Sequence, residues 1–553
     1  MSQVVLLESK KRLIQTLMQR SILLPPAFIQ KLDEASISKL VSRLDDSSLP
    51  SVSSASDLLQ VLRPDWSHQK AMQAVCSPSI SSPQSSPSMF DPYKAGSPCP
   101  GRSHPQPISV NVDLGDISDR QRAMMESGEF KVRVISDYNE KPKKREMADF
   151  VAYFNARYKA LEGLLRGRSE LSGVISISRV LQKKGKENVS VIGMVMEKIV
   201  TPNTQSVILT LEDPTGTLRV LFSKKNPDIY AAVKDVCEDE VVGVIGSTGG
   251  SSDNPILFGN NLLVPDVPLT KELKKAPTDH PGYAAFISDM HVGSKQFMED
   301  NFLKMVHWLK GTAGNEAQRA LASQVKYLFI GGDLVDGVGI YPGQEEDLAI
   351  KDIYAQYRRV SELIAQLPDS IKIIMIPGNH DAMRLNEPQP SLYKDICKPV
   401  WDLPNAMLVS NPTVVNIHGN ESFGGFDVLM YHGYSFDYYV ANVESIRING
   451  GYDRADLIMK YLLQRRHLAP AHTSTPYIPD SARDPLVISS VPDFFLTGHI
   501  HRTRVSSYRN VTLINGGCWQ DITAFQIKTG HTPEPCRVSL MDLHTREVRL
   551  LRF

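Results

Sequence analysis

The feature that most constrains the fold is a pattern that occurs five times from Tyr283 onward, in which a short apolar run is followed at once by a polar loop. The apolar runs are residues 284–288, 325–330, 371–376, 428–431 and 494–497. Short apolar runs that alternate with helical stretches are typical of βαβ units and parallel sheets. Open α/β sheets place their sites at the carboxyl ends of the strands. We therefore expect the five polar loops to meet at the carboxyl edge of a sheet.

The five loops supply oxygen and imidazole donors without any thiolate. They read Asp-Met-His from residue 289, Gly-Asp-Leu-Val-Asp from 332, Gly-Asn-His-Asp from 378, His-Gly from 432 and Gly-His-Ile-His from 498. Their candidate metal ligands are Asp289, His291, Asp333, Asn379, His432, His499 and His501. Seven ligands are too many for one ion but suit two if a carboxylate bridges them, and the donor mixture favours Mn, Fe or Zn over Ca or Mg alone. Two ions about 3.5–4 Å apart can clamp both oxygens of an in-line phosphoryl displacement, so the ordered set predicts a metallophosphoesterase.

Glycines stand beside the predicted ligands at positions 332, 378, 433 and 498. Glycine permits tight turns and close approach of the backbone to neighbouring groups. A crowded metal centre needs both properties, so these glycines fit the same interpretation.

Residues 171–268 change to short alternating runs. We expect strands at 189–195, 207–211, 218–222, 241–245 and 256–258, with a turn at 213–216. Five short strands in one segment predict a small closed barrel of the OB type. Phe222 is the only aromatic side chain in these strands before Phe258, and the nearest basic pair is at positions 224 and 225. A protein-docking barrel therefore fits the sequence as well as a barrel that binds single-stranded nucleic acid.

Three further segments precede the barrel. Apolar residues at helical spacing, interrupted by Pro25 and Pro26, predict a helical docking module at 1–70. Residues 71–115 are expected to form a disordered linker, because nine serines and eight prolines occupy 17 of the 31 positions from 77 to 107. Residues 116–170 are expected to form a basic, helical connector with a helix at 147–165, since residues 131–168 carry ten basic and five acidic side chains. We interpret this charge as a solvated face in preference to a phosphate-binding surface.

The composition narrows the class of protein further. The chain has 553 residues, which is too long for one hydrophobic core, and its 61 Lys plus Arg balance 61 Asp plus Glu. Charge neutrality argues against a free-standing basic nucleic-acid binder. No apolar run approaches the roughly 18 residues of a membrane span, and charged residues near Lys10 interrupt any signal-peptide core. Six scattered cysteines suit reduced thiols, so we expect a cytoplasmic protein with no membrane association.

The five motifs together resemble those of the calcineurin-like metallophosphoesterases, whose fold is a two-sheet α/β sandwich flanked by helices. With a barrel ahead of these motifs, and with the later string Asn-Gly-Gly-Cys-Trp-Gln from residue 515, the chain is similar to the small subunits of archaeal family D DNA polymerases. The resemblance implies a multidomain α+β protein. In it, an OB-fold at 171–268 precedes a metallophosphoesterase domain with 3′→5′ exonuclease activity at 280–553.

The resemblance also implies a role for each motif residue. The first ion would be held by Asp289, His291 and His501, and the second by Asn379, His432 and His499, with Asp333 as the bridge. His380 would stand over the scissile phosphate and stabilise charge or protonate the leaving 3′ oxygen, so His380 and Asp333 are the expected catalytic residues. Asp336 and Asp381 are expected to orient the ligands from behind. The expected cofactors are two Mn²⁺ ions, with Mg, Fe or Zn as alternatives, and no DNA-binding residue is identified.

On this basis we expect the small subunit of a two-subunit replicative polymerase, whose exonuclease removes misincorporated nucleotides. The implied partners are a large polymerase subunit, in a heterodimer or higher assembly, and DNA with a 3′ end. A sliding clamp or another replication factor is the expected partner of residues 1–70. The alternative is a non-catalytic scaffold, as in the eukaryotic polymerase B-subunits, which share the architecture but have lost the metal residues. The intact ligand set favours catalysis, and the barrel and docking module argue against a free phosphatase.

Overall fold

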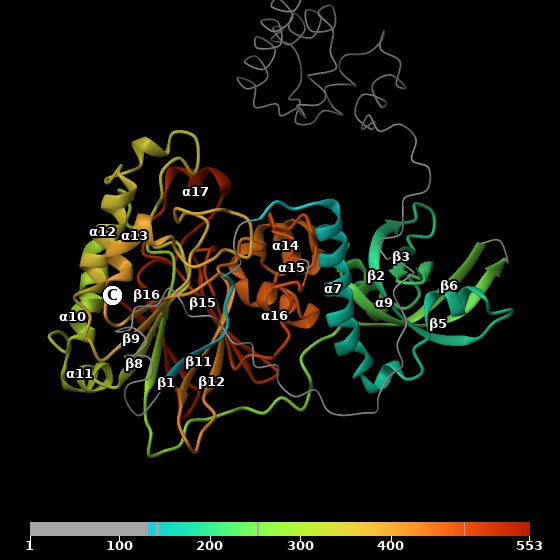
Figure 1. Ribbon diagram of the computed structural model, residues 1–553, viewed down its shortest axis with the longest axis horizontal. Coiled ribbons are helices and arrows are strands. Elements are labelled where there is room, and N and C mark those ends of the chain that lie inside the picture. Colours follow the sequence, from blue (N-terminus) through green and yellow to red (C-terminus); the bar gives the residue numbers. More distant parts are fainter. Residues whose placement is uncertain (1–130, 140–142, 252–253, 481) are drawn as a thin grey trace, which may run out of the picture. The chain divides into compact units, whose positions relative to one another are not determined.

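The computed structural model describes residues 131–139, 143–251, 254–480 and 482–553 (Figure 1). All of these belong to one compact unit, Ser88–Phe553. The predicted docking module at 1–70, the predicted linker at 71–115 and the first part of the predicted connector lie outside the described residues. Within the described residues the chain is a mixed α/β protein with a closed barrel and a two-sheet domain.

The two-sheet domain contains two six-stranded sheets. The first has the order β1-β11-β12-β13-β15-β14, with bounds Lys131–Ser136, Thr413–Gly419, Phe426–Met430, Phe494–Thr497, Val511–Gly516 and Thr503–Tyr508. The second has the order β10-β9-β8-β7-β16-β17, with bounds Ala406–Leu408, Lys372–Met375, Val325–Ile330, Tyr283–Ile287, Arg537–Asp542 and Val548–Arg552. The five apolar runs found in the sequence are β7, β8, β9, β12 and β13. They are divided between the two sheets, so the polar loops meet where the carboxyl ends of both sheets come together.

Three apolar layers hold this domain together. The layer between the sheets includes Phe286, Phe329 and Phe494, and the first two rings stack with centroids 5.0 Å apart. A second layer packs the outer face of the β7–β10 sheet against α10–α13, with bounds Glu299–Leu309, Glu316–Ala322, Ile353–Ile364 and Lys394–Trp401. A third packs the other sheet against α14, α15 and α16, with bounds Phe436–Asn442, Glu444–Ile448 and Ala455–Arg465. Both sheets are therefore fixed on both faces, which gives the loops at their edge a rigid base.

The closed barrel has the strand order β2-β3-β4-β6-β5. Its strands are Asn188–Val200, Val207–Asp213, Gly216–Phe222, Val241–Ser251 and Asn254–Leu263, and two short helices accompany them, α8 (Ile177–Leu181) and α9 (Pro227–Lys234). Of the two aromatic side chains noted in the expected strands, Phe222 is 1% exposed and belongs to the barrel core, whereas Phe258 is 43% exposed. The aromatic that can meet a ligand is therefore Phe258.

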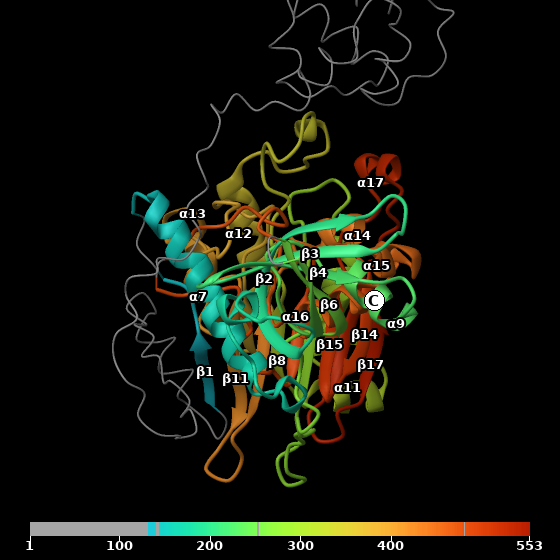
Figure 2. The same cartoon turned by 90° about the vertical axis from the view of Figure 1, so that its right-hand side faces the viewer.

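The segment before the barrel differs from the expected connector. The predicted helix at 147–165 is present as α7, Met147–Arg166, and packs against β2 and β5 of the barrel (Figure 2). The residues before it form β1, which pairs antiparallel with β11 of the two-sheet domain. The two-sheet domain thus takes a strand from ahead of the barrel, which the charge pattern of this segment did not suggest. Among the described residues, none of the helices combines the length and apolar character that crossing a membrane requires.

Candidate metal centre

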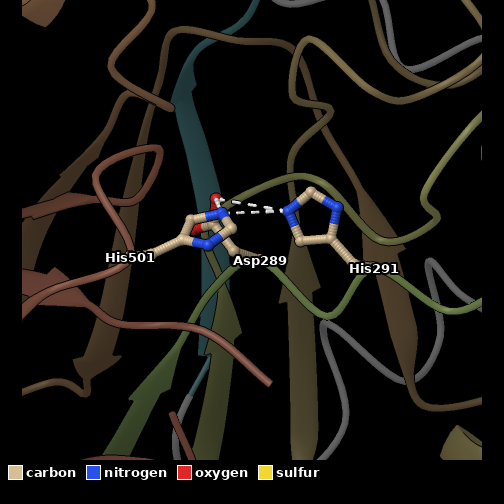
Figure 3. A group of neighbouring side chains, drawn as sticks. All are labelled: Asp289, His291 and His501. Atoms are coloured by element: carbon tan, nitrogen blue, oxygen red, sulfur yellow. Dashed lines mark hydrogen bonds and ion pairs between the residues drawn. The ribbon is translucent and has the colours of Figure 1, made fainter. Parts of the chain in front are cut away.

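The loops after β7 and β13 bring together the first group of predicted ligands (Figure 3). The Nε2 atoms of His291 and His501 are 3.0 Å apart. The Oδ1 atom of Asp289 is 3.4 Å from the Nε2 atom of His501 and 4.0 Å from that of His291. Their three donor atoms lie within 4.8 Å of one another, a spacing that can hold one metal ion.

The remaining predicted ligands lie beside this group. The Nε2 atom of His432 is 3.3 Å from Oδ2 of Asp333 and 2.9 Å from Oδ1 of Asn379. The same Asn379 oxygen is 2.9 Å from Nδ1 of His499. Asp333 Oδ2 also lies 3.7 Å from Nε2 of His291, so this carboxylate stands between the two groups. The structure therefore gathers all seven predicted ligands at one place.

The backbone at these donors is strained. Five of the seven have a positive φ, namely Asp289 (51°), His291 (51°), Asp333 (49°), His499 (70°) and His501 (58°). For residues other than glycine this conformation is uncommon and costs on the order of 1–3 kcal/mol each. Such strain is typical of functional sites, because the surrounding structure has to impose it.

The neighbouring glycines confirm the expected crowding. A Cβ atom on Gly378 would lie 2.2 Å from Oδ1 of Asp333, and one on Gly498 would lie 2.3 Å from Oδ2 of Asp289. Gly332 combines a φ of +104° with a distance of 2.6 Å from its hypothetical Cβ to Nδ1 of His432. Any side chain at these three positions would displace a predicted ligand.

Hydrogen bonds behind the histidines fix which ring nitrogen faces the centre. The Nδ1 atom of His432 donates to the carbonyl of Gly331 at 2.9 Å, since a carbonyl oxygen can only accept. The Nδ1 atom of His291 donates to the Asp336 carboxylate at 3.0 Å. In both residues Nε2 is therefore the atom directed at the centre, an arrangement that is usual for histidines that bind metals.

His380 shares this arrangement although it is not a predicted ligand. Its Nδ1 atom lies 2.8 Å from the backbone carbonyl of Asp336, to which it donates, and its side chain lines the cavity at the centre. Its backbone N–H donates to Oδ1 of Asp333 at 2.8 Å. Burial lowers the pKa of His380, so the imidazole is neutral at neutral pH.

Asp336 and Asp381 lie behind the donors. Asp336 accepts hydrogen bonds from His291 and from the side chains of Gln344 and Gln520. Asp381 accepts from the backbone N–H of Gly378 at 2.9 Å and from the Tyr357 hydroxyl at 3.0 Å. Burial raises the pKa of Asp381 to about 7. Both carboxylates connect the ligand loops to the helices and loops around them.

Asp437 is a residue of the centre that sequence reasoning missed. Its Oδ2 atom lies 3.1 Å from Nε2 of His499, so His499 directs Nδ1 at Asn379 and donates from Nε2 to a carboxylate. Asp437 therefore accepts a hydrogen bond from His499, just as Asp336 accepts one from His291. It lies on α14, five positions after His432, where no regular spacing relative to the other motifs marks it.

The charges of the centre suit cations. Burial alone would raise the pKa of Asp333, but His432 and His380 hold it well below its ordinary value. Burial would likewise raise the pKa of Asp289, and His501 lowers it. Conversely, burial would lower the pKa of His432, but Asp333 raises it above the ordinary value. Both carboxylates are thus ionised, and this set of oxygen and imidazole donors without thiolate fits two divalent ions.

Comparison with known proteins agrees with this geometry. The family model of the calcineurin-like phosphoesterases matches residues 283–503. The chain is 40% identical over 399 residues to the DNA polymerase II small subunit of Methanothermobacter thermautotrophicus. The aligned residues cover 72% of this chain and 78% of the relative. It is 38% identical over 421 residues to the subunit of that name from Archaeoglobus fulgidus. These aligned residues cover 76% of this chain and 80% of the relative. The chain therefore belongs to the small-subunit family of DNA polymerase II, the archaeal family D polymerase, and carries a calcineurin-like phosphoesterase domain.

Proposed function

We propose that this chain acts as a 3′→5′ exonuclease that removes misincorporated nucleotides for a two-subunit replicative DNA polymerase. The observation that carries the proposal is the complete donor set, with His380 beside it in the same cavity. A subunit that served only as a scaffold would have no need of seven converging donors and five strained backbone positions.

The donors divide into two ion sites in this proposal. Asp289, His291 and His501 hold one ion, Asn379, His432 and His499 hold the other, and Asp333 lies between them. The expected ion is Mn²⁺, and Mg, Fe and Zn are alternatives. Two bound divalent ions supply Lewis acidity and lower the pKa of a water molecule for in-line attack on a phosphodiester.

His380 stabilises the phosphate and assists the leaving group. Because Nδ1 donates to the Asp336 carbonyl, the ring atom available to substrate is Nε2. A bound phosphodiester brings negative charge next to this imidazole and favours its protonated form. The imidazolium can then donate its Nε2 proton to the departing 3′ oxygen.

The barrel and the polymerase partner complete the proposal. The strand order of the barrel, with α9 between β4 and β5, supports the OB-type assignment. Phe222 is buried, and Phe258 is the one exposed aromatic side chain in the described barrel strands, which gives little surface for stacking successive bases, so we propose that the barrel docks a protein. The relatives are named as small subunits, which supports a large polymerase subunit as the partner. The docking role of residues 1–70 stays a prediction.

The test is digestion of 3′-labelled single strands and mismatched primers by the full chain in Mn²⁺. We expect stepwise release of nucleotides from the 3′ end, and loss of this release in His380→Ala and Asp333→Ala. Matched controls are His307→Ala and Asp369→Ala, because both side chains are exposed and lie outside the cavity. No release by the wild-type chain, or equal release by all four variants, refutes the exonuclease. Co-purification of a large polymerase subunit by such an inactive chain would favour the scaffold instead.

A further inference from the structure

The cavity at the metal centre, about 270 Å³ in volume, extends beyond the predicted metal ligands. Its further lining includes Ile340 and Tyr341 from the loop after β8, Tyr452 from the turn between α15 and α16, and His531, which follows α17 (Ala524–Thr529). None of these four residues takes part in the donor set. The cavity thus joins a phosphate-binding centre to a partly apolar, partly aromatic pocket.

The aromatic side chains of this pocket are held in place. The Tyr341 hydroxyl donates to Asp347 at 3.0 Å. The Tyr452 side chain hydrogen-bonds to Asp437, the carboxylate that also supports His499. The rings of Tyr452 and His531 lie against each other, with centroids 4.4 Å apart and planes inclined by 42°. These contacts reduce the freedom that the rings would lose on binding a ligand, which favours stacking.

The charge of the lining indicates what kind of group enters. No lysine or arginine lines this cavity among the residues that the structure describes. A second phosphate, or the backbone of a complementary strand, would call for such cations. A nucleobase is uncharged and flat, and it stacks on aromatic side chains. The lining therefore fits a base that has separated from its complementary strand.

Three polar residues of the lining, Gln520, Thr523 and Gln526, hydrogen-bond to the protein. The Gln520 amide N–H groups donate to Ser294 and Asp336, both at 2.9 Å. Thr523 and Gln526 form the reciprocal cap of α17, and the Gln526 amide nitrogen lies 2.9 Å from His501 Nδ1. Since both amide N–H groups of Gln520 are in use, they cannot discriminate base edges.

We infer that Ile340, Tyr341, Tyr452 and His531 form a subsite for the unpaired base of a 3′-terminal nucleotide, which binds by stacking and without sequence preference. The inference rests on the proposed phosphodiesterase function of the adjoining centre and specifies its substrate. A terminal base that is paired with its complement has to leave the stack before it can enter, so a mismatched end reaches the centre more readily than a matched one.

The test uses a single strand that carries 2-aminopurine at its 3′ end and a slowly hydrolysed phosphorothioate as its last linkage. We expect binding by the full chain in Mn²⁺ to quench the 2-aminopurine fluorescence. Tyr452→Ala should raise the Kd about 5- to 100-fold, the range expected for loss of one base–aromatic stack. Tyr452→Phe, which retains the ring, should restore the quenching. Tyr354→Ala, at a tyrosine that is 53% exposed on α12, is the matched control and should bind as wild type.

Two further DNA ligands test whether binding depends on an unpaired terminal base. A strand that ends in an abasic deoxyribose should bind wild type and Tyr452→Ala equally, and a fully paired 3′ end should bind more weakly than an unpaired one. Absence of quenching, or a Kd that Tyr452→Ala leaves unchanged, overturns the subsite. Quenching that depends on Tyr452 in a chain that cleaves no primer would support the subsite and refute the exonuclease, so the two failures are distinguishable.

Discussion

Arg157 on α7 and Asp484 form an ion pair that is almost completely removed from water. The Arg157 Nε to Asp484 Oδ2 distance is 2.7 Å, and the two side chains are 1% and 0% exposed. Arg157 also donates to the Pro470 carbonyl at 2.7 Å, and His467 donates from Nε2 to Asp484 at 2.8 Å. Asp484→Asn keeps the shape but leaves the buried guanidinium without its counter-charge. Removing one partner of a buried pair costs about 3–5 kcal/mol, and we expect the free energy of unfolding to fall by that amount.

The same helix offers a matched control. Arg166 and Glu162 form an i,i+4 pair with the same N–O distance, 2.7 Å, but these side chains are 52% and 23% exposed. An exposed helical pair contributes about 0.3–0.5 kcal/mol, so Glu162→Gln should change stability very little. Both arginines lie on α7 and both N–O distances are 2.7 Å, so the two variants contrast a buried long-range pair with an exposed pair inside the helix.

The assay is urea unfolding of the full chain, followed by circular dichroism at pH 7. Equal effects of Asp484→Asn and Glu162→Gln, or a loss below about 1 kcal/mol for Asp484→Asn, would refute the argument from burial. The pH dependence gives a second check. Burial alone would raise the pKa of Asp484, but His467 and Arg157 hold it below its ordinary value. Its stabilisation is therefore complete above the unfolded-state pKa of about 3.9 and is lost as the pH falls through the lower folded-state pKa. The wild type and Asp484→Asn should accordingly converge in acid.

Three further predictions concern the metal centre. Gly498→Ala places a Cβ atom 2.0 Å from Oγ of Ser288 and should destabilise the chain by about 1–3 kcal/mol. By contrast, Gly163→Ala, at an exposed position of α7 with nothing within 4 Å, should stabilise it by about 0.5–1 kcal/mol. Urea unfolding of both variants checks this, and a destabilising Gly163→Ala would contradict it. Asp437→Asn should weaken Mn²⁺ binding about 10- to 100-fold by calorimetry, because His499 loses its carboxylate partner, and unchanged affinity would remove Asp437 from the centre. Adding Mn²⁺ at about 100 times its Kd to chelator-treated chain should stabilise it by about 2.7 kcal/mol in a thermal melt, and an unshifted melting temperature would argue against the site.

The elements that could be predicted from the sequence are those whose signal is local. The expected runs 325–330 and 494–497 coincide with β8 and β13 residue for residue, because each is a mainly apolar strand that ends in a recognisable loop. The expected helix at 147–165 differs from α7 by one residue. The donors were found for the same reason, since each lies directly after a strand.

The elements that could not be predicted depend on distant partners. The sequence of β1 has the pattern of a basic segment and does not indicate a strand. Only its pairing with β11, more than 270 residues later, makes it part of the sheet. Asp437 becomes part of the centre only because α14 brings it to His499. The inward direction of Phe222 follows from barrel closure, which alternation alone does not determine.

The centre is held in place by the protein itself, and the backbone shows how. Asp289 N–H donates to the Gly332 carbonyl at 3.0 Å, and His291 N–H donates to the Asp333 carbonyl at 3.1 Å, so the loops after β7 and β8 are joined at the residues whose φ is positive. His499 N–H donates to the Asp289 carboxylate at 3.0 Å, which links the two sheets across the centre. Two of these bonds join one strained donor to another and the third joins Asp289 to the residue before Asp333, and the buried layers of both sheets prevent the loops from relaxing separately. Strain of about 1–3 kcal/mol per donor can persist only under such restraint. The same residues therefore fix the fold of this edge and position the donors, which explains why short motifs that each follow a strand converge at one place.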